Sequence, residues 1–150
     1  MRFRLVSLMI VATAMLSGRV AYATTYYVAP TGNDGADGRS PTNAFRTLQK
    51  AHDVSAPGDE IVVASGTYSA PGRASVLDIT RSGRADAWIK YHADAGPRPK
   101  LRLDGTQWHA IRIAAAAYIE IRGFEVEGNA ADVTLAYAQS ESHNANNPKT

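Results

Sequence analysis

Residues 24–68 constrain the fold more than any other part of the chain, because they place four local signals in a fixed order. An extended aromatic opener, Tyr26-Tyr27-Val28, runs into a loop over 31–38 that is dense in Gly, Asn and Asp. An amphipathic stretch over 47–55 follows, and Pro57-Gly58-Asp59 then leads into a β-branched strand. Gly, Asn and Asp favour turns, so we expect the loop to lie on the surface.

The amphipathic stretch predicts one short helix. Thr47 is a suitable N-cap, and Pro57 prevents the helix from continuing. The apolar side chains recur at helical spacing on one side, which should face the core: Leu48, Ala51 and Val54.

From Asp59 onward the chain reads as short β-rich runs separated by turns, with no helical period. Several runs alternate aliphatic and charged residues, as in Ile119-Glu120-Ile121. An antiparallel sandwich would alternate equally well, so alternation leaves the architecture open. Runs begin 22 to 25 positions apart, from Val76 to Leu101, Leu101 to Phe124 and Ile111 to Val133, as in a repeated three-strand coil. The predicted strands are 61–64, 76–79, 88–91, 101–104, 111–113, 118–121, 124–127 and 133–137.

The ordered signals, closed by Gly66-Thr67-Tyr68, resemble the opening of secreted right-handed parallel β-helix proteins of the pectate-lyase-like superfamily. That opening commonly reads YYV-P-G-D, then PF-T-I-KA, PGD-I-V and GTY. The resemblance covers about a third of the chain and implies an all-β solenoid with a short N-terminal capping α-helix. The cap would cover the first coil, whose lumen and free edge would otherwise invite pairing. We expect a signal peptide at 1–23, the opener, loop and cap at 24–58, and the first coils at 59–150.

The first residues read as a secretory signal. Arg2 and Arg4 form a basic region, residues 5–16 are apolar, and Ala21-Tyr22-Ala23 is a cleavage site. The apolar run is too short to span a membrane, so we expect a secreted or periplasmic protein that starts at Thr24. The chain ends in a polar segment over 139–150 without a capping element, so we also expect a solenoid truncated at its C-terminus.

Charge and cysteine content exclude several classes of protein. Removing Arg2, Arg4 and Arg19 from 16 basic residues leaves 13 against 14 acidic ones, so composition does not support a nucleic-acid-binding surface. There is no cysteine, which excludes disulfides, thiolate metal sites and a cysteine nucleophile. No Gly-rich phosphate loop and no GxSxG elbow is present either. We expect a monomer whose partner is a glycan.

The sequence contains few candidates for a metal site. No histidine pair has the i, i+4 spacing of a helical zinc site, so structural roles are expected for His52, partly exposed on the cap helix, and for His92 and His109; His143 is the fourth histidine. Oxygen ligands in the first loop could bind calcium, but their spacing does not match an EF-hand, so a plain turn is preferred: Asn33, Asp34 and Asp37.

The resemblance directs attention to polysaccharide chemistry. Cleavage by β-elimination needs a group that neutralises the uronate carboxylate and a base for the C5 proton, and lysine or arginine can be that base only where its pKa is depressed. Basic residues of suitable type on or beside strands are Lys90, Lys100, Arg102, Arg112 and Arg122. Carboxylates that could pair for glycoside hydrolysis are Asp78, Asp104, Glu120, Glu125 and Glu127. Solvated strand faces explain both sets equally well. Trp88 and Trp108 could stack on sugars, although packing between coils is the favoured interpretation.

The favoured hypothesis is an exported carbohydrate-active β-helix protein that acts on an acidic polysaccharide by lyase-like β-elimination. None of the superfamily's catalytic or calcium-ligand residues matches a motif in this chain, so none is transferred, and the catalytic coils are expected beyond it. Catalytic and metal-binding residues stay unassigned, and calcium is an expectation for the full-length protein only. The alternative is a non-catalytic glycan-binding or adhesin-type surface β-helix.

Overall fold

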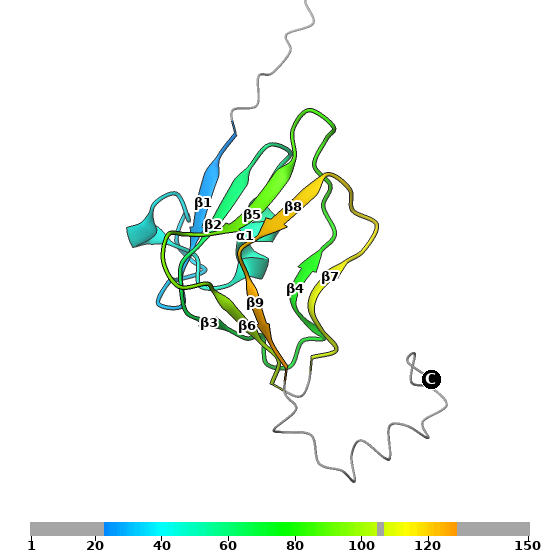
Figure 1. The fold of residues 1–150 in the computed structure, drawn as a ribbon. Helices are drawn as coiled ribbons and strands as arrows, with labels where there is room; N and C mark the ends of the chain where they lie inside the picture. The colour runs from blue at the N-terminus through cyan, green and yellow to red at the C-terminus, as the bar shows by residue number, and fades with distance from the viewer. Residues whose placement is uncertain (1–22, 105–106, 129–150) are drawn as a thin grey trace, which may run out of the picture.

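The computed structural model describes residues 23–104 and 107–128, and its strands form three parallel sheets around one core (Figure 1). Sheet A has the order β1 (Thr25–Val28), β2 (Glu60–Val63), β5 (Ile89–Ala93) and β8 (Ile119–Arg122). Sheet B contains β3 (Thr67–Tyr68), β6 (Lys100–Arg102) and β9 (Glu125–Glu127), and sheet C contains β4 (Ser75–Ile79) and β7 (His109–Ile113). The chain visits A, B and C in turn, so the predicted parallel β-helix is confirmed.

The register of the sheets corrects the predicted coil length. Paired residues lie between 25 positions apart, from Lys100 to Glu125, and 35 positions apart, from Thr25 to Glu60. Val76 and Leu101 are not a coil apart at all, because they lie in sheets C and B, and Leu101 pairs with Val126 instead of Phe124. The spacing was wrong because the turns between sheets differ in length and a run start does not reveal its sheet.

Seven of the eight predicted strands are present with shifts of one or two residues, and the described structure adds β1 at the extended opener and the two-residue strand β3. The run over 133–137, residues 1–22 of the predicted signal peptide, and His143 lie outside the described residues.

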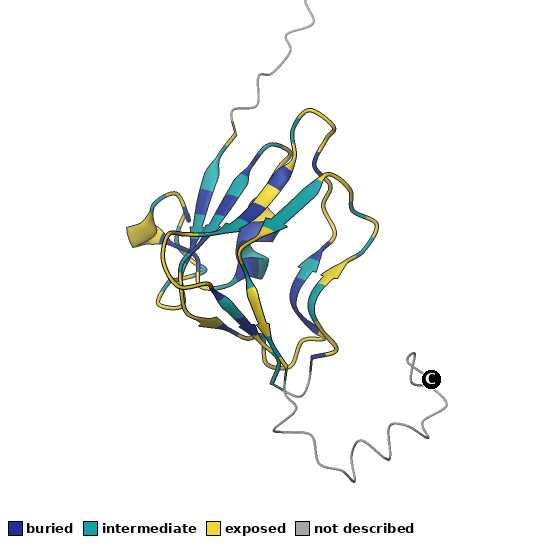
Figure 2. Ribbon diagram, in the orientation of Figure 1, coloured by how far each residue is buried: buried dark blue, intermediate teal, exposed yellow. Residues whose placement is uncertain are grey.

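Inward-facing residues stack into columns along the solenoid. In sheet A, Tyr26, Ile61, Tyr91 and Ile121 occupy one register column, and the first three are buried. Alternate residues of the same strands, such as Glu60 and Lys90, point outward. Figure 2 shows buried segments alternating with less buried ones along the strands, and this alternation places aliphatic groups in the lumen and charges in solvent.

The short helix α1 (Leu48–Val54) covers the first coil. The Thr47 hydroxyl accepts a hydrogen bond from the backbone N–H of Lys50 at 3.1 Å, so the predicted N-cap is confirmed. Leu48 and Ala51 are buried as expected, but Val54 is 37% exposed. His52 takes the third inward position and is fully buried, so the partial exposure expected for it was wrong.

Two side chains of α1 satisfy backbone groups of β4, the first strand of sheet C. The Gln49 amide oxygen accepts a hydrogen bond from Asp78 N at 2.9 Å, and the Gln49 amide nitrogen donates to Asp78 O at 3.2 Å. His52 Nε2 accepts from Thr80 N at 3.1 Å. The backbone groups along the side of a helix already bond within the helix, so they cannot pair with the free edge of β4. The Gln49 and His52 side chains therefore make the hydrogen bonds that a preceding strand would have made.

The hydrogen bonds of His52 fix its protonation state. Because Nε2 accepts from a backbone N–H, the proton of the neutral ring is on Nδ1, which lies 2.7 Å from the Tyr91 hydroxyl. Burial lowers the pKa of His52; Asp53 and Asp78 oppose the shift, and Arg81 adds to it. A second proton would point Nε2–H at Thr80 N–H, so the cap requires neutral histidine.

We predict that Leu48→Asp lowers the free energy of unfolding by about 3 to 5 kcal/mol, because it buries an unpaired charge in place of a core leucine. Val54→Asp, on the same helix but exposed, should change it by only about 0.5 kcal/mol. Urea unfolding of the full-length protein measures both. Equal losses in the two variants would contradict the capping role of Leu48.

We also predict a pH dependence of stability from His52. Since its folded pKa lies below the ordinary value of 6.5, its neutral form stabilises the fold fully above pH 6.5. This stability falls as the pH drops from 6.5 toward the folded pKa. Urea unfolding at several values between about pH 5.5 and 7 should show this decline in the wild type and a flatter profile in His52→Asn. Parallel profiles would contradict the assignment.

Candidate functional site

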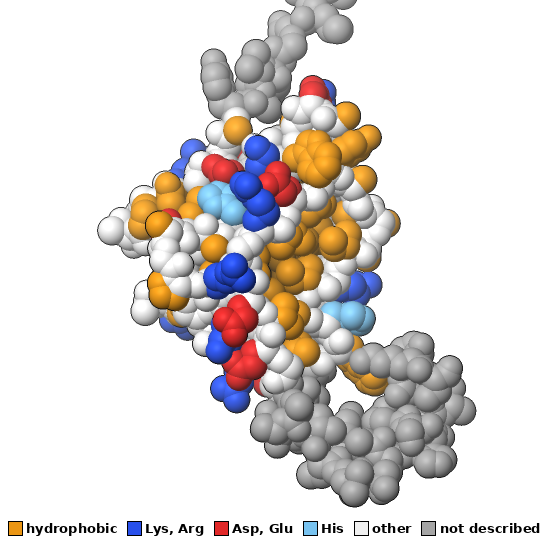
Figure 3. Space-filling view, in the orientation of Figure 1, with side chains coloured by type: hydrophobic (Ala, Val, Ile, Leu, Met, Phe, Trp, Pro, Cys, Tyr) orange, Lys and Arg blue, Asp and Glu red, His pale blue; other side chains and the backbone are white. Residues whose placement is uncertain are grey.

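The outward face of sheet A brings together residues from three successive coils. His92 Nε2 lies 2.8 Å from Glu60 Oε1, and Arg122 Nε lies 2.6 Å from Glu120 Oε1. The register places Lys90 between Glu60 and Glu120. Figure 3 shows charged side chains as a band beside a strip of hydrophobic ones. This face is a ladder of alternating charges.

Sheet B carries a second ladder around Lys100. Its Nζ lies 2.9 Å from Glu127 and 3.7 Å from Glu125, and Arg102 Nε lies 3.9 Å from Glu127. The hydrogen bond to Glu127 is the main cause that raises the pKa of Lys100, and the same bond lowers the pKa of Glu127. Glu125 and Glu127 therefore both serve as partners of one lysine.

Sheet C contributes a single paired arginine. Arg112 Nε and Nη2 donate to the two oxygens of Asp78 at 2.6 and 3.2 Å, and this bidentate contact raises the pKa of Arg112. A base for β-elimination needs the opposite shift. The geometry therefore disfavours both Lys100 and Arg112 as the base.

The remaining acidic and histidine candidates are scattered. Asp104 follows β6, and its backbone N–H donates to Gln107 Oε1 at 2.6 Å. His109 begins β7 and is exposed. Among the described residues, no group of three or more His, Asp or Glu side chains is placed to hold a metal ion.

Side chains of the first loop accept hydrogen bonds from nearby groups of the same chain. Asp34 Oδ1 accepts hydrogen bonds from the N–H groups of Arg46 and Thr47 at 2.8 and 2.9 Å, and Oδ2 accepts from the Thr47 hydroxyl at 2.9 Å. Asn33 and Asp37 accept from Gly35 N and Arg39 N, two residues further on. The contacts of Asn33 and Asp37 are Asx turns, and those of Asp34 connect the loop to the start of the helix.

Two aromatic side chains form an exposed pair on neighbouring coils. Trp88 and Tyr118 precede β5 and β8, are 43% and 44% exposed, and meet edge to face with ring centroids 6.0 Å apart. Packing between coils, as favoured for Trp88, is therefore observed. Tyr118 has a positive φ of 58°, which is uncommon for a residue with a bulky side chain. Its carbonyl accepts a hydrogen bond from Ile89 N at 3.1 Å, which helps to hold this conformation.

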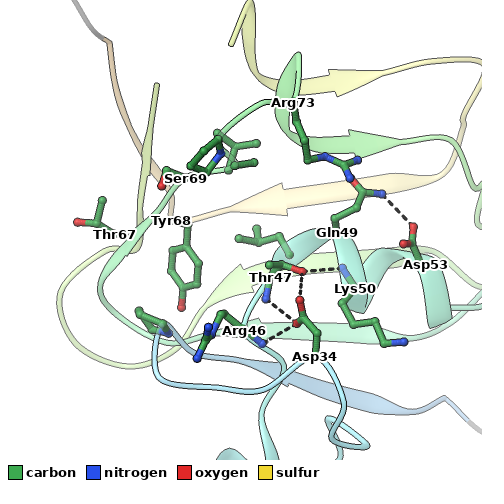
Figure 4. A pocket seen from close by; sticks show the side chains of 15 residues that line it. Asp34, Arg46, Thr47, Gln49, Lys50, Asp53, Thr67, Tyr68, Ser69 and Arg73 are labelled. Atoms are coloured by element: carbon green, nitrogen blue, oxygen red, sulfur yellow. Dashed lines mark hydrogen bonds between the residues drawn. The ribbon is translucent and has the colours of Figure 1, made fainter. Parts of the chain in front are cut away.

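A pocket of about 600 Å³ lies between the start of α1 and the loop that connects β3 to β4 (Figure 4). Its apolar wall has the exposed Pro30 and Pro71 at the surface and the buried Leu48, Tyr68 and Val76 behind them. The charged and polar residues that line it are Asp34, Arg46, Thr47, Gln49, Lys50, Asp53, Thr67, Ser69 and Arg73.

Sequence reasoning did not find this pocket. Its two walls are more than a dozen positions apart, and each reads alone as an ordinary helix start or an ordinary turn. The one available signal was the pair Arg46 and Lys50. Two basic residues are unexpected at the start of a helix that was predicted to face the core, and they could have indicated a charged cavity there.

Comparisons with known proteins agree with the fold. Among solved structures, the chain is similar to a rhamnogalacturonan lyase, with a TM-score of 0.61 and 26% identity over 69% of this chain and 28% of that one. It shares its fold with the GH136 lacto-N-biosidase from Eubacterium ramulus, with a TM-score of 0.57 and 19% identity over 77% of this chain and 22% of that one. The chain thus spans less than a third of the length of either structure.

A search of curated proteins gave no match. Among the described residues, no helix has the length and apolar character needed to cross a membrane. Residues 26–148, most of the chain, match the family model described as Pel9A-like, right handed beta helix region. The sequence, the three parallel sheets and this match together establish that the chain belongs to the Pel9A-like right-handed β-helix family.

Proposed function

We propose that this chain is part of an exported protein that cleaves an acidic polysaccharide by β-elimination. The observation that carries the proposal is the likeness to a rhamnogalacturonan lyase, within a family whose model is described as Pel9A-like. A fold alone hosts many activities, so the reaction must be tested on the full-length protein.

The described coils supply scaffold and binding surface in this proposal. Lys100 and Arg112 have raised pKa values, and Arg122 is held in an ion pair. A base at neutral pH needs a depressed pKa, so we assign the base and the groups that neutralise the uronate carboxylate to coils outside the described residues.

The lyase reaction has a direct assay. The full-length protein, incubated with rhamnogalacturonan, polygalacturonate or alginate in the presence of calcium, should release unsaturated products that absorb in the ultraviolet. Lys100→Ala should keep most of this activity, because that side chain is assigned to the ladder on sheet B. A flat trace with every uronate polymer would refute the lyase proposal.

Two further parts of the proposal concern calcium and export. Calcium is proposed as a cofactor of the full-length protein, where it would neutralise substrate carboxylates. Export is supported by the basic and apolar pattern at the N-terminus and by the polymeric nature of the proposed substrate. Loss of activity on addition of a chelator, restored by calcium, supports the cofactor, and N-terminal sequencing of the mature protein tests cleavage before Thr24.

The exposed Trp88–Tyr118 pair favours a second candidate, a glycan-binding protein without catalysis. Aromatic faces stack on the apolar side of pyranose rings, and the pair lies beside the charged ladder of sheet A, whose groups can bond sugar hydroxyls.

For this candidate we predict that Trp88→Ala and Tyr118→Ala each weaken retention on a pectin or alginate column, by about two- to tenfold in affinity. Trp108→Ala is the matched control, since Trp108 is also 43% exposed but precedes β7 in sheet C. Thermal melting checks that each variant folds. If the control lost as much affinity as the two variants, the aromatic pair would not be the binding surface.

A further inference from the structure

The pocket between α1 and the β3–β4 loop brings together three cations that are not paired with a carboxylate of a described residue. On the outer faces of the sheets, Lys100, Arg112 and Arg122 each contact a carboxylate. In the pocket, Arg46, Lys50 and Arg73 take part in no ion pair with a described residue. Positive charge is therefore left available around one cavity.

The contacts that these cations do make leave most of their donors available. Arg46 Nε donates to Gly32 O at 3.0 Å, and Lys50 Nζ lies 6.0 Å from the centre of the Phe45 ring. Arg46 and Lys50 come from the cap side, and Arg73 comes from the facing loop. Figure 4 shows the Arg73 side chain extending from that loop toward Gln49. Cations thus approach the cavity from two walls.

The two acids of the pocket do not cancel this charge equally. Both oxygens of Asp34 already accept hydrogen bonds from Arg46 N, Thr47 N and the Thr47 hydroxyl. Asp53 Oδ1 accepts from Gln49 Nε2 at 2.9 Å, while its other oxygen has no hydrogen bond with a described residue. The pocket therefore offers cationic donors together with one carboxylate acceptor, and Thr67 and Ser69 also line it.

We infer that this pocket binds an acidic saccharide, a pyranose unit that carries a carboxylate, at the capped end of the solenoid. The cations would bind the carboxylate, Asp53 would accept hydrogen bonds from sugar hydroxyls, and the exposed Pro30 and Pro71 of the apolar wall would contact the apolar ring face. A volume of about 600 Å³ suits one or two sugar rings. A simple inorganic anion would need neither the acceptor nor the apolar wall. The inference deepens the proposed function, because it adds a second contact for the same class of polymer.

The test is calorimetric titration of the full-length protein with digalacturonate. An active site elsewhere would bind the same probe, so the readout includes the number of sites. In Lys50→Ala/Arg73→Ala, the affinity of the pocket should fall by about tenfold or more, because each change removes a charged hydrogen-bond donor. Over the concentrations that fill the wild-type sites, this variant should therefore bind less digalacturonate, by up to one equivalent. Neither side chain has a hydrogen bond with a described residue, and thermal melting verifies folding.

The matched control is Arg39→Ala/Arg98→Ala, which removes the same net charge from two exposed arginines outside the pocket lining. Its affinity should change by less than about twofold, because distant exposed charges are screened at physiological salt. Unchanged stoichiometry and affinity in the pocket variant, or equal losses in the control, would overturn the inference.

Asp53→Ala separates a sugar site from a simple anion site. It removes the acceptor and leaves the cations, so digalacturonate should bind more weakly while inorganic phosphate should not. If both probes bound more tightly, the pocket would recognise charge alone and the saccharide assignment would be wrong.

Failure of the two proposals can be told apart. If the protein cleaved uronate polymers but the pocket variant bound as much digalacturonate as the wild type, the lyase function would stand and the pocket site would be refuted. If the pocket variant lost digalacturonate binding but the protein released no unsaturated product, the pocket site would stand and the lyase function would be refuted.

Discussion

The fold depends on how its first coil is closed. A parallel β-helix repeats the same pairing along its axis, so its first strand in each sheet has backbone groups that no earlier strand can satisfy. In sheet C, the Gln49 amide pairs with both backbone groups of Asp78, and His52 accepts from Thr80 N. Leu48 and Ala51 fill the lumen below. One seven-residue helix therefore supplies both the missing hydrogen bonds and the missing apolar contacts.

Closing the first coil in this way buries a titratable side chain, which is unfavourable when that side chain is charged. His52 is fully buried and must stay neutral, which ties the stability of the cap to pH. The Tyr91 hydroxyl, one of the His52 partners, sits on β5 of sheet A, so the cap contacts two sheets through one side chain. This link joins elements that are far apart in the sequence.

The distribution of charge separates scaffold from candidate binding surface. Across the outer faces, cations and carboxylates on neighbouring coils neutralise one another, and the pKa of Lys100 and of Arg112 is raised as a result. Such pairs stabilise little when exposed, but they keep strand faces solvated. The pocket near α1 groups three cations that have no carboxylate partner among the described residues, and this grouping around one cavity points to a ligand there.

Periodicity and turn chemistry predicted the element types well. The strands, the Thr47 cap and the parallel solenoid could be read from residues 24–128, because each depends on neighbours within a few positions or on an ordered family pattern. The coil spacing could not, because Val76 and Leu101 carry no mark of which sheet they join. The inward role of His52 was missed for the same reason: helical spacing alone favoured Val54, whereas the hydrogen bond to the Tyr91 hydroxyl and the one from Thr80 N select the imidazole.

By itself, then, the sequence determined what is local: alternation, the short helix, the turns and the resemblance that indicates a solenoid. Only the tertiary structure decided which charges meet. Lys100 pairs with Glu125 and Glu127, and Arg112 pairs with Asp78. The cations near α1 pair with no carboxylate among the described residues. The physical reason is that ion pairing and pocket formation depend on register between coils, and register is set by turn lengths and packing that no single run of residues encodes.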